Sequence, residues 1–187
     1  MPDEQKPLSS AGYSLVEAGI VIMALLIIAS FALPEFNTMR RRMSGDAALN
    51  QTVAQLRHGR ELAISQRRNI ELRFADERRI DLVRLEIPNG STVLSTVILD
   101  GNVEFRLFDD LPDTPDSFGK GSAVDFGGTE RLTFLSDGTL VNDDGNPVNG
   151  SVFLGLADHA ETARAVTIIG STGRVRGYRW TGKCWVH

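Results

Sequence analysis

The amino-acid sequence predicts an α+β fold in which one long N-terminal helix packs on an antiparallel β-sheet domain. Three observations predict it. Residues 18–33 carry no charged side chain, and apolar residues then recur at three- to four-residue steps from Phe36 to Leu56. From Ile70 onward, short alternating runs lie between turns rich in Gly, Asn and Asp. The length of 187 residues suits one membrane helix and one domain of ordinary size.

The apolar run is long enough to cross a membrane. Residues 13–33 would form a helix of about 31 Å, which matches the hydrocarbon thickness of a bilayer. Glu17 is an acid near the start of this run, directly after the pair Gly12-Tyr13. A charge inside a spanning helix costs roughly 2.5–3.5 kcal/mol on insertion scales, so Glu17 needs a partner or a purpose.

This arrangement of Gly, aromatic residue, acid and apolar helix resembles the N-terminus of type IV pilins and type II secretion pseudopilins. The resemblance implies that prepilin peptidase cleaves between Gly12 and Tyr13 and that Tyr13 is then N-methylated. Glu17 becomes the fifth residue of the mature chain, where it would neutralise the N-terminal amine of a neighbouring subunit. A buried carboxylate is tolerable beside an ammonium group. Pro34 stands where family members have a kinking proline.

Three other interpretations of the same stretch remain open. Ser30-Phe31-Ala32 has the small-x-small form of a signal peptidase site, and cleavage after Ala32 would release a soluble exported domain. A plain membrane anchor explains the length but not Glu17. A core helix of a soluble protein does not need sixteen uncharged residues in line. The three arginines 40–42 follow the span on the expected outer side, against the positive-inside tendency.

The helical pattern continues past Pro34 to about residue 67, with an apolar stripe that would pack on a sheet. A coiled-coil partner is the alternative use of this stripe. Gly45 is a weak point, because a glycine inside a helix costs about 1 kcal/mol relative to Ala. The helix end at residues 56–69 and the following strand resemble the GspH/FimT group of minor pilins and pseudopilins.

Strands dominate the remainder. The first three are expected to form an antiparallel meander, with a bulge at Leu82-Val83 where the alternation slips. Asp100-Gly101-Asn102 predicts a hairpin into a fourth strand on the same sheet. The expected strands cover residues 70–74, 80–87, 93–99, 103–107, 131–135, 151–156 and 165–169, and the 173–176 segment resembles the closing strand of the GspH/FimT domain.

Residues 109–128 are rich in Asp, Pro and Gly and predict a long surface loop. Its four aspartates could hold calcium, but their spacing fits no calcium motif, so a solvated acidic loop is favoured. The four are Asp109, Asp110, Asp113 and Asp116.

The C-terminal segment is the second informative stretch, because no acidic residue follows Glu161. Cations interleaved with aromatic residues can bind a phosphate backbone and stack on bases. In FimT-type members, which end in a similar Gly-Arg-x-Arg motif, this segment is associated with DNA binding during uptake. The alternative is an edge strand whose arginines are solvated. The candidate DNA-binding residues are Arg174, Arg176, Arg179 and Lys183.

Nothing in the sequence predicts an enzyme, a cofactor or a metal site. The histidines His58, His159 and His187 are scattered, and His159 is expected in a polar surface turn. The single Cys184 cannot form an internal disulfide. The net charge of −4 gives no global sign of nucleic-acid binding.

The resemblance therefore implies a minor pseudopilin, a structural subunit of the type II secretion pseudopilus. The alternative is a FimT-like minor type IV pilin that binds DNA for uptake or adhesion. Its expected partners are other pilins or pseudopilins, prepilin peptidase and the inner membrane, with the C-terminal domain in the periplasm. The expected segments are a leader (1–12), a transmembrane and assembly helix (13–34), its amphipathic continuation (35–68) and a β-rich periplasmic domain (69–187).

Overall fold

The computed structural model describes residues 14–86, 88–129 and 131–187, so the expected cleavage pair Gly12-Tyr13 and Ile87 lie outside the described residues. The chain divides into two compact units, Met1–Met39 and Arg40–His187. One helix, α1 (Leu15–Gln66), runs without interruption through the position of Pro34. The expectation of one long N-terminal helix packed on an antiparallel β-sheet domain is confirmed.

The first unit contains the apolar part of α1. Within the described residues, α1 is the one helix whose length and composition would allow it to cross a membrane. Its large apolar side chains between Leu15 and Ile28 are all at least half exposed. Surface of this kind requires an apolar environment that the described residues do not provide.

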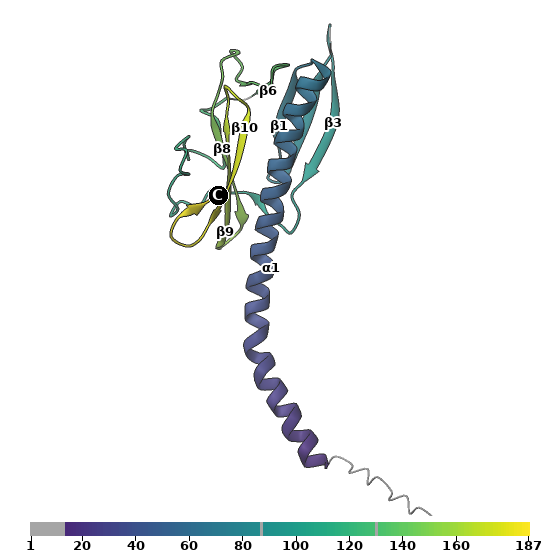
Figure 1. Ribbon diagram of the computed structural model, residues 1–187, viewed down its shortest axis with the longest axis vertical. Coiled ribbons are helices and arrows are strands. Elements are labelled where there is room, and N and C mark those ends of the chain that lie inside the picture. The colour runs from purple at the N-terminus through teal and green to yellow at the C-terminus, as the bar shows by residue number, and fades with distance from the viewer. Residues whose placement is uncertain (1–13, 87, 130) are drawn as a thin grey trace, which may run out of the picture. The chain divides into compact units, whose positions relative to one another are not determined.

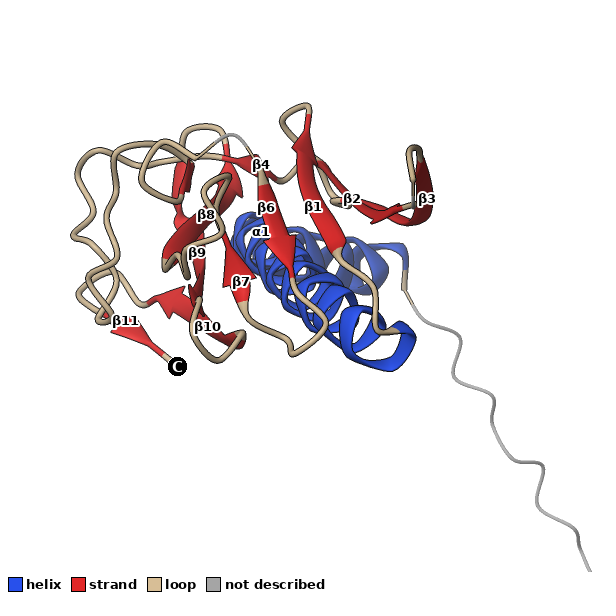
Figure 2. Cartoon of the chain, turned by 90° about the horizontal axis from the view of Figure 1, so that it is seen from above, coloured by secondary structure: helices blue, strands red, loops and turns tan. Residues whose placement is uncertain are grey.

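The second unit holds two antiparallel sheets beside the C-terminal part of α1 (Figures 1 and 2). The first sheet has five strands in the order β3-β2-β1-β6-β7, and β1, β2 and β3 form the expected meander. The register shifts between Leu82 and Val83, so the predicted bulge is confirmed. Its strands are β1 (Ile70–Ala75), β2 (Arg79–Leu85), β3 (Ser91–Ile98), β6 (Leu132–Phe134) and β7 (Leu140–Val141).

The second sheet has the order β11-β10-β9-β8-β4, and a short strand β5 also pairs with β8. Strand β9 begins six residues earlier than expected, so His159 opens a strand instead of lying in a turn. The sequence pattern did not reveal this start, because Thr162 and Arg164 are polar residues that the fold nevertheless buries. The strands are β4 (Glu104–Phe105), β5 (Val124–Asp125), β8 (Gly150–Leu156), β9 (His159–Ile169), β10 (Arg174–Trp180) and β11 (Trp185–Val186).

The hairpin expected at Asp100-Gly101-Asn102 is wrong. A turn is present, but the next strand, β4, pairs with β8 of the second sheet and not with β3. Burial explains the crossing, because Val103 is fully buried and the Phe105 ring packs edge-on against Phe74 of the first sheet at 5.3 Å. After this turn the chain therefore leaves the first sheet and continues into the second.

Small residues on α1 let the helix approach both sheets closely. A Cβ atom added at Gly45 would lie 2.8 Å from the Thr162 carbonyl oxygen of β9, and one at Gly59 would lie 2.8 Å from Leu82 of β2. Ala48 and Ala63 on the same helix are fully buried. The helical cost of Gly45 is therefore offset by close packing on β9.

Candidate functional site

The N-terminal candidate site is represented by Glu17, which lies in the first turn of α1. Its carboxylate is exposed, as are the apolar side chains of its neighbours Val16 and Ile20. Within the described part of the chain, no cation forms an ion pair with Glu17. The positive end of the helix dipole stabilises an acid in the first turn of any helix. It therefore does not explain why an acid stands at the start of an apolar span.

The four candidate cations of the C-terminal segment lie in two different places. Successive residues of a strand point to opposite faces, so Arg174 and Arg176 share one face of β10 while Arg179 lies on the other. The guanidinium of Arg179 is 3.1 Å from the carboxylate of Asp46 on α1. Lys183 is exposed in the turn before β11. The four side chains thus do not line one continuous track.

Arg176 is held by an acid from the long loop. Its guanidinium forms an ion pair with Asp116, whose carboxylate also accepts hydrogen bonds from the hydroxyls of Tyr178 (2.8 Å) and Thr167 (2.6 Å). Burial acts to raise the pKa of Asp116, but these hydrogen bonds and the charge of Arg176 outweigh it, so the pKa lies below its ordinary value. The expectation of a solvated acidic loop is wrong for Asp116.

A cationic cleft forms where the β9–β10 turn meets α1. Arg57 and Arg60 of the helix lie across it from Arg174 and Arg176, and the cleft has a volume of about 380 Å³. Its acidic lining residue is Glu61. The lining residues are Arg57, Arg60, Glu61, Thr172, Gly173, Arg174, Val175, Arg176 and His187.

The glycine of the Gly-Arg-x-Arg motif shapes this cleft. Gly173 has a φ of 61°, and a Cβ atom there would overlap the carbonyl oxygen of Gly138. Arg60 donates a hydrogen bond to that carbonyl at 3.3 Å, and Arg57 donates one to the Val175 carbonyl at 3.4 Å. Arg57 is therefore tied to β10, and Arg60 is tied to the β6–β7 turn against which Gly173 packs. Both arginines line the cleft, which can bind an anion. Sequence reasoning missed Arg57 and Arg60, although their i, i+3 spacing places them on one helix face.

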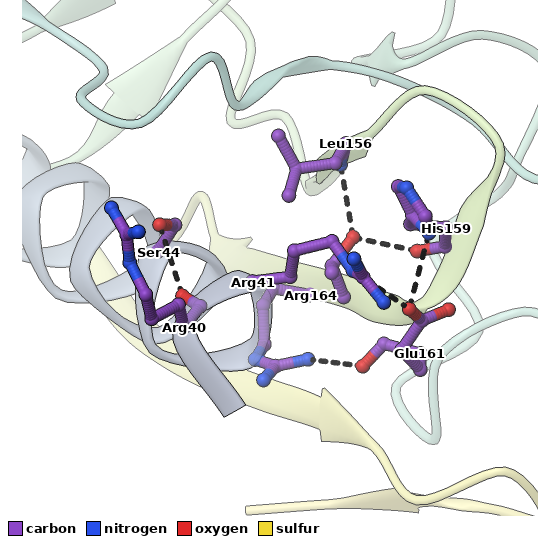
Figure 3. A network of polar contacts seen from close by, with 8 residues as sticks. Arg40, Arg41, Ser44, Leu156, His159, Glu161 and Arg164 are labelled. Atoms are coloured by element: carbon purple, nitrogen blue, oxygen red, sulfur yellow. Dashed lines mark hydrogen bonds and ion pairs between the residues drawn. The ribbon is translucent and has the colours of Figure 1, made fainter. Parts of the chain in front are cut away.

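A second polar cluster ties the β8–β9 hairpin to α1 (Figure 3). Arg164 is only 4% exposed, and its guanidinium lies 2.8 Å from Asp46. It also donates hydrogen bonds to the carbonyl oxygens of Arg42, Glu161 and Ala163 at 2.8–3.3 Å.

Beside Arg164, the carboxylate of Glu161 lies 3.5 Å from Arg41 and 3.2 Å from the Nδ1 atom of His159 (Figure 3). Burial acts to raise the pKa of Glu161, but its own backbone N–H and the neighbouring charges of His159 and Arg41 hold it below its ordinary value. Across the described residues, no group of three or more His, Cys, Asp or Glu is placed to hold a metal ion.

Comparison with known proteins places this geometry in a known fold. No family model and no curated protein sequence matches the chain. The type IV minor pilin FimU of Pseudomonas aeruginosa is similar in structure, with a TM-score of 0.53 and 16% identity over 80% of this chain and 97% of that one. The minor pseudopilin EpsH from the type 2 secretion system of Vibrio cholerae gives a TM-score of 0.50 and 14% identity, over 73% of this chain and 97% of that one. At this identity the likeness establishes a pilin-like fold.

Proposed function

We propose that this chain is a minor pseudopilin of the GspH/FimT group, a structural subunit of the type II secretion pseudopilus. The observation that carries the proposal is an unburied apolar helix with one acid at its start, joined to a pilin-like domain. EpsH, one of the similar structures, is a minor pseudopilin of such a system. The leader is then residues 1–12, the membrane and assembly helix 13–34, its continuation 35–68 and the periplasmic domain 69–187.

The exposed helix explains how one segment serves two environments. Its apolar side chains contact lipid before assembly and the helices of neighbouring subunits afterwards, and both surroundings exclude water. Glu17 is the exception, since its charge is costly in either environment without a counter-charge. A Tyr13 amine exposed by prepilin peptidase cleavage on a neighbouring subunit supplies that counter-charge. Filament assembly is then coupled to pairing of the two groups.

Replacing Glu17 with Val tests the proposed function. We expect Glu17→Val to be cleaved after Gly12 and inserted into the membrane as the parent is, because the substitution removes only the cost of a buried charge. Incorporation into filaments should fall at least tenfold, which co-purification with the other pilin-like subunits of the native host measures. Mass spectrometry of the N-terminal peptide checks that the mature chain begins with methylated Tyr13.

Glu35→Val is the matched control, since it removes an exposed acid from the same helix just past the apolar run. It should assemble normally. If Glu17→Val assembles as well as the parent, Glu17 does not pair subunits in the filament. A mature chain that begins at Leu33 and is free in the periplasm would contradict the pilin interpretation altogether.

The cationic cleft favours a second candidate function, the binding of DNA by a minor type IV pilin. Four arginines from α1 and β10 line one cleft of about 380 Å³. Arg176 is already neutralised by Asp116, so Arg57 and Arg174 are the better contributors to phosphate contacts.

Titration of the full chain in neutral detergent with duplex DNA, at several salt concentrations, tests this function. If the cleft binds phosphate, Arg57→Gln with Arg174→Gln should lower the salt slope of log K by about 0.9 per lost contact and weaken binding alike across sequences. Arg42→Gln with Lys183→Gln removes the same charge away from the cleft and should leave the slope unchanged. Equal losses in the two double variants, or no salt-dependent binding by the parent, would eliminate the cleft as a DNA site.

A further inference from the structure

A second cationic surface lies at the end of the second unit where α1 enters it, and it is separate from the cleft. It surrounds a hollow of about 490 Å³ between α1, the β8–β9 hairpin and the β10–β11 turn. We call it the basic–aromatic end and define it by Arg42, Arg179, Trp180 and Lys183. The hollow itself is lined by Arg42, Ala160, Glu161, Arg164, Arg179, Trp180, Thr181, Gly182 and Val186.

Positive charge is in excess on this end. Two of its acids are occupied by its own cations, since Asp46 pairs with Arg164 and Arg179, and Glu161 contacts Arg41 and His159. The turn between β8 and β9 adds the exposed acid Asp158. Arg42 and Lys183, in contrast, form no ion pair with an acid among the described residues.

The length of the chain keeps this end close to the membrane. Seven residue steps separate Leu33, the last residue of the apolar run, from Arg40. Seven steps reach at most about 25 Å when fully extended and about 10 Å as a helix. The headgroup layer adds roughly 5–8 Å beyond the hydrocarbon on each side. Because α1 continues as a helix past Arg40, the shorter distance applies, and Arg40 lies within reach of the headgroups once residues 13–34 span the bilayer.

The residue types also suit a membrane surface. Trp180 is half-buried against Trp185, with 5.3 Å between the ring centroids, and borders the hollow. Tryptophan is enriched at membrane–water interfaces, and arginine and lysine extend their charged ends toward headgroup phosphates. The cleft, in contrast, has no tryptophan in its lining.

We propose that the basic–aromatic end docks on the anionic phospholipid headgroups of the leaflet that faces the domain. The inference rests on the proposed function, because it requires residues 13–34 to span that membrane. Contact with anionic headgroups also accounts for the arginines that follow the span on the outer side, where the positive-inside tendency disfavours them. Before assembly, this contact holds the domain against the bilayer surface, and extraction into a filament breaks it.

The full chain in phospholipid vesicles tests the proposal with its own cysteine as the reporter. Cys184 is the single cysteine, is exposed and follows Lys183, so it accepts a fluorophore without any substitution. Spin-labelled headgroups should quench this fluorophore in vesicles that contain phosphatidylglycerol and not in vesicles of phosphatidylcholine alone. The quenching should disappear near 1 M salt, where the Debye length is about 3 Å.

The two double variants provide the matched comparison. Each cation near an anionic surface contributes about a fivefold factor, so Arg42→Gln with Lys183→Gln should lower the ratio of docked to undocked domain about 25-fold. Arg57→Gln with Arg174→Gln removes the same charge from the cleft and should dock as the parent does. Circular dichroism confirms that both variants are folded.

The possible failures are distinguishable. If the chain does not float with the vesicles and resist alkaline extraction, residues 13–34 do not span a membrane and the proposed function fails. If the chain is inserted but quenching is independent of lipid charge, the lipid inference is wrong and the proposed function stands. Equal loss of docking in both double variants would assign the attraction to net charge and overturn the assignment of this surface.

Discussion

Replacing Arg164 with Leu is expected to lower the free energy of unfolding by about 3–5 kcal/mol. The guanidinium is almost fully buried, and it donates hydrogen bonds to the Asp46 carboxylate and to three backbone carbonyls from α1 and β9. A leucine of similar volume would remove this donor from the three carbonyls and leave Asp46 with Arg179 alone, at the contact between the helix and the second sheet. Removing one partner of a buried ion pair typically costs this amount. Urea unfolding of the full chain in detergent, followed by tryptophan fluorescence, measures the change.

Arg179→Leu is the matched control, because Arg179 contacts the same carboxylate of Asp46 but its side chain is 55% exposed. An exposed ion pair contributes about 0–1 kcal/mol, so the control should lose no more than that. Arg164→Lys should lie between the two, since an ammonium cannot replace the planar set of donors. If Arg164→Leu and Arg179→Leu unfold at the same urea concentration, the buried guanidinium does not join the sheet to the helix.

Local patterns were sufficient to predict the long helix and the first three strands. Alternation and turn residues specify neighbouring strands, and the slip at Leu82-Val83 was visible because a bulge reverses the faces of the residues that follow. The same signals could not show that there are two sheets. The turn at Asp100-Gly101-Asn102 has the same composition whether the next strand pairs locally or crosses the core. The deciding contact, between Phe105 and Phe74, joins two sheets and is encoded in no short segment.

The candidate sites differ in the same way. Glu17 could be selected from the sequence because a charge at the start of an apolar run is itself an anomaly. The cleft could not be predicted, because arginines such as Arg57 and Arg60 are ordinary on an exposed helix face until the fold brings β10 beside them. Asp116 lies sixty positions from Arg176, so no local pattern separates it from the other loop aspartates.

Replacing Asp116 with Asn is expected to lower the free energy of unfolding at neutral pH by about 1.5–3 kcal/mol, the contribution of hydrogen bonds to a charged group. The carboxylate joins the long loop to Thr167 of β9 and to Arg176 and Tyr178 of β10. Asparagine keeps the shape and one acceptor oxygen but loses the charge that Arg176 faces. Asp110→Asn, in the same loop but exposed, is the control and should change the free energy of unfolding by less than about 0.5 kcal/mol.

The effect of Asp116→Asn should also depend on pH in a defined direction. The pKa of Asp116 in the folded protein lies below its ordinary value of about 3.9, so the unfolded chain binds the proton more readily than the folded one. The stability that the carboxylate contributes is therefore fully present above pH 4 and is lost as the pH falls through the lower folded value. The difference in urea midpoint between parent and Asp116→Asn should shrink steadily below pH 4. A difference that is constant from neutral to acidic pH would mean that Asp116 acts through its shape alone, and that its charge does not hold the loop on β10.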